Sequence, residues 1–340
     1  MDMNRRSFLH LTALGALGIN TIASEGYAGI TETVETRNGM PYRRLGSTPE
    51  NVSLLCLGGF HIGQRQVSEA LSLRIMRTAI DEGVNFLDNA WAYHDGRSEE
   101  RMGKALKDGY RDKVFLMTKH KGRDPKTAQE QLEVSLRRLD VDVIDLWQFH
   151  EVVHPATPKK LYDLKVMEVA LKAKEEGKIR YIGCTGHHMP SIQAEMIDRG
   201  FPWDTVQVPL NIFDYHFNSY TKNVLPKANE KGMGVIAMKS LGGTPAAIPK
   251  TGVASAAECL HYAMNLPVST VCSGMDSMEV LRENLKTAKS FVPIEAQEIA
   301  ALLSKAAPYA ATGEHETYKT KWHRDIQEML KKESAQKTLS

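Results

Sequence analysis

The chain has 340 residues, of which 43 are basic and 41 acidic, and its formal net charge is +2. Charges of both signs are mixed along the chain without a basic stripe, which argues against nucleic acid and an anionic membrane surface as partners. A small neutral or weakly charged ligand fits better, and the length suits either two ordinary domains or one α/β barrel.

Residues 1–28 are predicted to be an export signal rather than part of the fold. The segment Asn4–Leu9 contains the pair Arg5-Arg6 and matches a twin-arginine signature, and a modestly apolar run follows it. That run is too short for a permanent membrane anchor. The pattern predicts a periplasmic protein that engages the twin-arginine export machinery. An amphipathic helix that carries an Arg pair by chance is the alternative.

After the signal, strand-like segments alternate with helical patterns. Eight strands are predicted, at Val52–Leu57, Val84–Leu87, Val114–Thr118, Val143–Trp147, Ile179–Cys184, Thr205–Val208, Gly234–Ala237 and Ser269–Cys272. Eight helices are predicted, at Ser68–Glu82, Ser98–Lys107, Pro125–Leu139, Pro158–Glu176, Pro190–Asp198, Ser219–Lys231, Ser255–Asn265 and Ser277–Lys289.

This alternation predicts a (β/α)8 TIM barrel over residues 29–312, because right-handed crossovers repeated eight times curl a parallel sheet into a closed barrel. An open doubly wound sheet is the alternative, although no G-x-G-x-x-G follows the first strand. The remaining residues, 313–340, are polar and charged. They are predicted to form a surface helix that frays.

No metal site or iron–sulfur cluster is predicted. His150 and His154 flank a glutamate in the pattern of a zinc protease, but that pattern works only on a helix. A strand-like run precedes His150 and Pro155 follows His154, so a helix is disfavoured there. The four cysteines are widely spaced, form no CxxC and are interpreted as core thiols: Cys56, Cys184, Cys259 and Cys272.

Polar residues follow three consecutive predicted strands. Asp88, with Tyr93 five residues later, follows the second strand, whereas Lys119 follows the third and His150 the fourth. The active site of such a barrel lies at the carboxyl ends of its strands, so these side chains are expected at one rim. There, Asp88 can pair with Lys119, whose charge lowers the pKa of a nearby tyrosine. The set predicts proton chemistry on a carbonyl group, with His150 donating a hydrogen bond to the substrate oxygen.

Over about Met40 to Lys289, the sequence resembles the aldo-keto reductases. The resemblance is carried by Leu57–Gly59, Phe86–Tyr93, Thr118–Lys119, Leu146–His150 and Glu283–Leu285. It implies an oxidoreductase that acts on a small-molecule carbonyl or alcohol with NADPH in a (β/α)8 barrel. It implies further that Tyr93 is the general acid and that Lys119 tunes it. Asp88 then supports Lys119, and His150 orients the substrate.

The same resemblance implies a cofactor site. Gln207 matches the family's contact to the nicotinamide carboxamide, Thr185 replaces a hydroxyl, and Met238 stands where the family often stacks a tyrosine on the ring. Gly186 lacks the usual amide, which His187 could supply. The full set of expected contacts is Gly59, Phe60, Thr185, Gly186, Gln207, Met238, Lys239, Ser240, Leu241, Gly242, Gly274, Glu283 and Asn284.

NADP(H) is expected ahead of NAD(H), which stays open as the alternative. Gly274 and Val280 stand where the family commonly keeps a Lys and an Arg for the 2′-phosphate, which weakens the case for NADP(H). Lys239 and Arg282 are nearby candidates for the same contact. The four-cysteine cluster of some relatives is not expected, because no cysteine follows Cys272.

A second function stays open at this point. The export signal and the altered nicotinamide contacts also suit an exported protein that holds its nucleotide. Such a protein would serve as a binding or regulatory subunit, or would be an enzyme that recycles a tightly bound nucleotide within one reaction.

Overall fold

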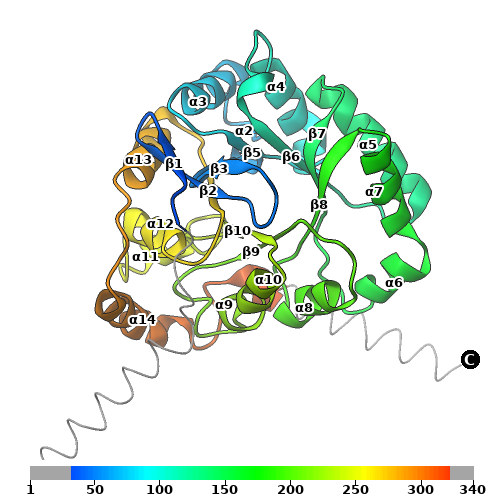
Figure 1. Cartoon of the computed structure of the whole chain (residues 1–340). Helices are drawn as coiled ribbons and strands as arrows, with labels where there is room; N and C mark the ends of the chain where they lie inside the picture. The colour runs from blue at the N-terminus through cyan, green and yellow to red at the C-terminus, as the bar shows by residue number, and fades with distance from the viewer. Residues whose placement is uncertain (1–31, 322–340) are drawn as a thin grey trace, which may run out of the picture.

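The computed structural model describes residues 32–321, and its centre is a closed barrel of eight parallel strands with helices around the outside (Figure 1). Around the barrel the strands are β4 (Leu55–Gly58), β5 (Phe86–Asp88), β6 (Phe115–His120), β7 (Ile144–Phe149), β8 (Ile179–Thr185), β9 (Thr205–Pro209), β10 (Gly234–Met238) and β11 (Thr270–Gly274). The predicted TIM barrel is confirmed, and seven of its predicted strands differ from the observed ones only at their ends.

Side chains along each strand alternate between two buried layers. Phe86, Met117 and Ile236 belong to the cluster that fills the barrel interior. Leu87 and Trp147 belong to the larger cluster between the strands and the helices. Because both faces of the sheet are buried, the strands read as continuous apolar runs that end in polar residues at the carboxyl rim.

Helices follow the strands as crossovers. They are α3 (Glu69–Asp81), α4 (Arg97–Ala105), α5 (Pro125–Leu139), α6 (Thr157–Asp163), α7 (Val166–Glu175), α8 (Pro190–Asp198), α9 (Tyr220–Asn223), α10 (Leu225–Glu230), α12 (Ala256–Met264) and α13 (Met278–Lys289). Short helical turns occur at α2 (Gly59–Ile62), η1 (Tyr93–Gly96), η2 (Arg111–Lys113) and α11 (Ala247–Lys250), and α14 (Ala296–Ala310) follows the barrel.

Two predicted helices are wrong because each is divided into two shorter helices in the structure. The segment Pro158–Glu176 is divided into α6 and α7 at Lys165, whose φ of 58° is left-handed and ends a helix. The segment Ser219–Lys231 is divided into α9 and α10 just before Pro226, which lacks the amide that would continue a helix from the preceding turn.

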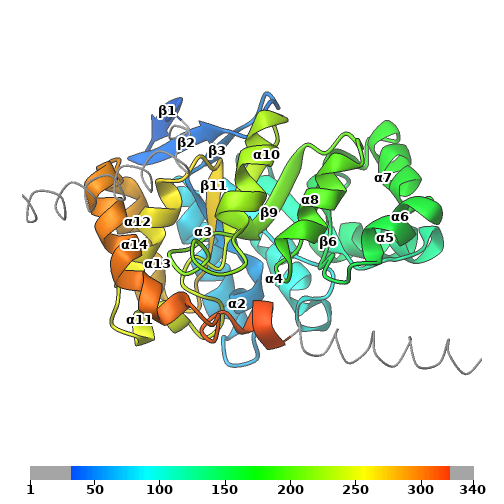
Figure 2. The same cartoon turned by 90° about the horizontal axis from the view of Figure 1, so that it is seen from below.

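The first predicted strand, Val52–Leu57, is also divided in two. Its beginning lies in β3 (Asn51–Ser53), which pairs with β2 (Met40–Arg44) and, beyond it, β1 (Glu35–Arg37) in a separate antiparallel sheet. This sheet lies at one end of the barrel, opposite the end where α2 and the C-terminal residues lie (Figure 2). Leu45 and Val52 pack into the interior cluster from that end, so the amino end of the barrel is closed.

Of the predicted surface helix from about Gly313, the structure describes residues 313–321, of which 317–321 are helical, but this part does not lie at the surface as predicted. Glu316, Tyr318 and Lys319 are 0%, 7% and 1% exposed, and this segment crosses the carboxyl end of the barrel (Figure 2). Its charged residues are buried because they pair with one another and with loop residues. The predicted export signal and the end of the predicted tail lie outside residues 32–321. Within that range, no helix has the length and apolar character to cross a membrane.

Candidate active site

The four residues predicted to be catalytic come from three neighbouring strands at the carboxyl end of the barrel. Asp88 ends β5, and Tyr93 begins η1 on the loop that follows it. Lys119 lies near the end of β6, and His150 directly follows β7. The barrel therefore brings all four backbones to one rim.

Lys119 joins three groups of this rim through its ammonium. It donates to Oδ1 of Asp88 in a short ion pair, to the carbonyl oxygen of Asn89 at 2.7 Å, and to the hydroxyl of Tyr93 at 3.2 Å. Lys119 and Asp88 are only 1% and 4% exposed. Their attraction is therefore weakly screened, and the ammonium is held beside the phenol.

Charge and burial have opposing effects on the pKa values of Lys119 and Tyr93. Burial alone would lower the pKa of Lys119, but the Asp88 carboxylate raises it well above its ordinary value. Burial raises the pKa of Tyr93 well above its ordinary value, and Lys119 opposes that rise without overcoming it. The predicted lowering of the Tyr93 pKa by the charge of Lys119 has the expected sign, but burial outweighs it. The phenol keeps its proton at neutral pH.

His150 lies beside Tyr93, with the ring centroids 5.6 Å apart and the planes almost perpendicular. Burial, with the nearby charge of Lys119, lowers the pKa of His150 well below its ordinary value, so the ring is neutral and has one N–H. Its Nδ1 is buried and has no hydrogen-bond partner within residues 32–321. A backbone bond to His120 at 2.8 Å and the Arg123 guanidinium on its carbonyl hold the residue in place.

The zinc pattern at His150–His154 has no helix to support it, because residues 151–154 form irregular backbone. Glu151, in its centre, pairs with Lys121 at 2.5 Å and lies 3.8 Å from His187. Across the described part of the chain, no three metal-binding side chains come together.

Gln207, in β9, contacts Asp88 across the barrel. Its Nε2 donates to Oδ2 of Asp88 at 3.1 Å. Its Oε1 is buried and has no hydrogen-bond partner within residues 32–321. An unpaired buried acceptor is costly, so Gln207 fits the predicted contact to a carboxamide N–H.

Further predicted cofactor residues lie at the ends of β8 and β10. Thr185 is 2% exposed and pairs in register with Gln207. A Cβ on Gly186 would lie 2.0 Å from Nε2 of Gln193, so no amide side chain fits there. Met238 ends β10, and Lys239 follows it with a left-handed φ of 54°. The hydroxyl of Ser240 is buried without a hydrogen-bond partner in the described chain.

At the end of β11, the strand next to β10, His61 occupies the space beside Gly274. A Cβ on Gly274 would lie 1.8 Å from Nδ1 of His61, so the glycine is required by this close approach. Asn284 is buried and donates to Ser273 at 3.0 Å, whereas Glu283 is exposed on the same helix. The structure therefore brings Asn284, but not Glu283, to the end of β11. Sequence reasoning did not identify His61.

The turn after β4 also reaches Tyr93. Phe60 is 38% exposed, and its ring meets that of Tyr93 edge-on at a centroid distance of 5.4 Å. A Cβ on Gly59 would lie 2.3 Å from the carbonyl oxygen of Asp88, so only glycine allows the turn to approach this closely.

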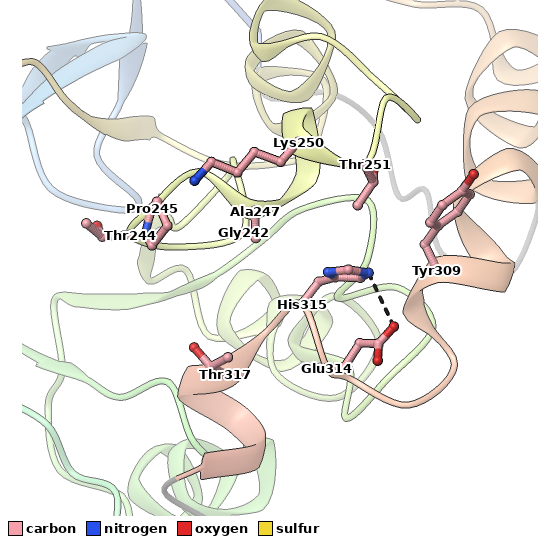
Figure 3. A pocket seen from close by; sticks show the side chains of 10 residues that line it. All are labelled: Gly242, Thr244, Pro245, Ala247, Lys250, Thr251, Tyr309, Glu314, His315 and Thr317. Carbon is pink, nitrogen blue, oxygen red and sulfur yellow. Dashed lines mark ion pairs between the residues drawn. The ribbon is translucent and has the colours of Figure 1, made fainter.

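The loop after β10 and the C-terminal segment enclose a hollow of about 550 Å³ (Figure 3). Leu241 and Gly242 begin this loop, and Gly242 lines the hollow. Lys250 lies on one side of the hollow, and the pair Glu314 and His315, 3.4 Å apart, lies on the other. None of the four residues of the cluster lines this hollow.

Two further groups at the rim were missed by sequence reasoning. Cys272 donates its thiol proton to Oδ2 of Asp88 at 3.0 Å. Strand alternation puts it on the same face as Gly274, which was the available signal. Tyr318 comes from the C-terminal segment, and its ring lies 5.1 Å from Nζ of Lys239 and 6.0 Å from the ring of His187. Its polar sequence context gave no signal.

Comparison with known proteins shows which family has this sequence pattern. The family model for the aldo/keto reductase family matches residues 54–247, a segment that contains all four residues of the cluster. The chain is similar to the aldo-keto reductase YhdN of Bacillus subtilis (strain 168), with 33% identity over 218 residues, covering 59% of this chain and 62% of YhdN. It thus spans somewhat less than two thirds of the length of that relative.

Two other comparisons agree. The uncharacterized oxidoreductase YrpG of Bacillus subtilis (strain 168) is 31% identical over 228 residues, which cover 60% of this chain and 67% of YrpG. The solved structure of aldo-keto reductase AKR11C1 from Bacillus halodurans, in its holo form, superposes with a TM-score of 0.68 at 25% identity. That match covers 82% of this chain and 99% of the other.

Proposed function

The chain belongs to the aldo/keto reductase family, and on this basis we propose that it reduces aldehydes or ketones to alcohols with a nicotinamide nucleotide, with Tyr93 as the general acid. The observation that carries the proposal is that one buried ammonium, Lys119, contacts both the Asp88 carboxylate and the Tyr93 hydroxyl. A phenol is a weak acid, so a fixed cation is needed to stabilise the phenolate that its proton leaves behind.

When bound, the nucleotide supplies the hydride. Negative charge then develops on the carbonyl oxygen, and Tyr93 delivers its proton to that oxygen. The neutral ring of His150, beside Tyr93, donates its N–H to the same oxygen and orients the substrate. Asp88 keeps Lys119 charged in its buried position. These residues complete the reduction without a covalent intermediate on the protein.

Three groups support a nucleotide at this rim. Oε1 of Gln207 and the hydroxyl of Ser240 are buried and have no hydrogen-bond partner within residues 32–321. Lys239 is partly buried, and its ammonium lies 5.1 Å from the centre of the Tyr318 ring. Burial lowers the pKa of Lys239, so an anion beside it would favour its charged form. We propose NADP(H) as the cofactor, with Lys239 as a phosphate contact.

The test is the reduction of 4-nitrobenzaldehyde by the purified protein with NADPH and with NADH. NADPH is expected to give the higher kcat/KM. Tyr93→Phe is expected to lower kcat by about 10²- to 10⁴-fold, the usual contribution of a general acid. The matched control is Tyr110→Phe, because the Tyr110 hydroxyl donates to Asp81 at the protein surface, 3.0 Å away, and its loss should leave kcat unchanged.

Equal rates for wild type and Tyr93→Phe would show that another group is the acid. If the folded wild-type protein reduces no aldehyde or ketone with either nucleotide, carbonyl reduction is not its function.

A further inference from the structure

Asp88 is held by a thiol as well as by an amide. Its Oδ1 binds Lys119, whereas its Oδ2 accepts from Sγ of Cys272 at 3.0 Å and from Nε2 of Gln207 at 3.1 Å. Asp88 is 4% exposed, so water does not readily replace a donor that is lost. Each donor to this carboxylate therefore affects where its two oxygens lie.

Strand pairing fixes the thiol in this position. The register of β11 on β4 sets Cys272 directly opposite Cys56, and Cys272 packs on the cluster that fills the barrel interior, to which Cys56 belongs. The neighbouring Cys56 thiol, burial and the charge of Asp88 all raise the pKa of Cys272. The thiol therefore stays protonated at neutral pH and can donate.

The other cysteines show what an ordinary core thiol looks like in this protein. Cys184 and Cys259 lie in the apolar layer between the strands and the helices, and burial raises the pKa of each to about 12. Within residues 32–321 neither donates to a carboxylate, whereas Cys272 does. Cys272 is also only partly buried, whereas the other two are buried.

We propose that Cys272 is a positioning residue for carbonyl reduction, whose thiol holds the Asp88 carboxylate so that Asp88 fixes Lys119 against Tyr93. Gln207 shares this task, but its amide also has to present Oε1 to the cofactor. The thiol serves Asp88 alone. The inference rests on the proposed function, because the positioning matters only if Tyr93 transfers a proton.

The kinetic test compares two substitutions at one position. Cys272→Val fills the same space without a donor, and we expect kcat to fall roughly three- to ten-fold, as for the loss of one weak donor to a charged acceptor. KM for aldehyde and for nucleotide should change little, because the thiol of Cys272 donates to Asp88 and acts through it. Cys272→Ser keeps a hydroxyl donor and should recover most of the kcat. Cys184→Val, the same change in the outer layer, should leave kcat unchanged.

A second measurement needs no turnover. The infrared S–H stretching band of Cys272, isolated as the difference between wild type and Cys272→Val, should lie at lower frequency than that of Cys184, isolated with Cys184→Val. A carboxylate acceptor weakens the S–H bond, and the apolar layer does not.

Wild-type kcat in Cys272→Val, or equal frequencies for the two bands, would overturn the proposal. A loss of kcat that Cys272→Ser does not recover would also overturn it, because the thiol would then act by packing. If wild-type protein reduces no carbonyl compound, the proposed function fails, and the infrared bands alone decide whether the thiol holds Asp88.

Discussion

Two buried lysines at the carboxyl end of the barrel have the same burial and different surroundings. Lys119, on β6, and Lys319, in the C-terminal segment, are each 1% exposed. The ammonium of Lys119 contacts Asp88, the Asn89 carbonyl and the Tyr93 hydroxyl. Lys319 donates to Asp214 at 2.6 Å, the Phe217 carbonyl at 2.7 Å and Glu316 at 3.1 Å.

The difference lies in the partners. Around Lys319 the carboxylates are themselves saturated, since Asp214 accepts from the backbone of Tyr220 and Thr221, and Glu316 accepts from the Tyr318 hydroxyl. The Lys319 ammonium and both carboxylates therefore bind the C-terminal segment to the loop that contains Asp214. Around Lys119 one partner is a protonated phenol, Tyr93, which we propose as the proton donor to the substrate. Burial of an ion pair therefore does not indicate function by itself, and the proposed function depends on this additional partner.

The largest effect that would test this comparison is expected from Lys119→Met. The substitution removes the cation that stabilises the Tyr93 phenolate, and we expect kcat to fall by about 10²- to 10⁴-fold. Steady-state kinetics with 4-nitrobenzaldehyde and NADPH measure it. Lys319→Met, assayed below its unfolding temperature, should retain a kcat within a few-fold of wild type. Similar losses of kcat in both variants would contradict the distinction.

The sequence allowed the Lys119 cluster to be predicted and not the Lys319 cluster. Asp88, Lys119 and His150 each follow an apolar strand, so strand order alone places them together. Asp214 and Lys319 are 105 residues apart, and neither follows a barrel strand directly. The stretch around Lys319 is polar, so it resembles a solvated tail until tertiary pairing buries it.

Other features could not be predicted from the sequence because they also depend on tertiary contacts or on local backbone conformation. Strand alternation places Cys272 on the face of Gly274, but no local pattern shows that its proton reaches Asp88. The pattern over Pro158–Glu176 is helical throughout, and only the left-handed backbone of Lys165 divides it. Glu283 lies on α13 next to the buried Asn284, and the phase of this helix leaves the Glu283 side chain exposed.

A second, smaller effect is expected on stability from Lys319→Met. Removal of this cation leaves two carboxylates buried without their counter-charge, and the free energy of unfolding should fall by about 3–5 kcal/mol. Chemical denaturation at neutral pH measures it. Lys321→Met is the matched control, because Lys321 is exposed two residues further on and its loss should change stability by less than about 0.5 kcal/mol. A small effect at both positions would show that the segment is not held by Lys319.

The smallest expected effect is in how stability depends on pH. Burial raises the pKa of Glu316 above its ordinary 4.5, against the opposing charge of Lys319. A carboxyl group whose folded-state pKa is raised favours folding most below its unfolded pKa, and this contribution is lost as pH rises through the folded value. Glu316→Gln removes the titration, so its stability relative to wild type should rise as pH increases from about 4.5 toward neutrality, by about 1.4 kcal/mol per unit of pKa difference.

Denaturation of wild type and Glu316→Gln at several pH values measures this change, with Glu314→Gln, at an exposed neighbour, as the control that should follow wild type. If the two lysines belong to separate clusters, the pH profile of kcat should not depend on Glu316. Because Glu316 pairs with Lys319 and makes no direct contact with Lys119 or Tyr93, the pH profile of kcat should be the same in Glu316→Gln as in wild type. A shift of that profile would mean that the C-terminal cluster takes part in the proton chemistry of Tyr93, and the two buried lysines would then belong to one site.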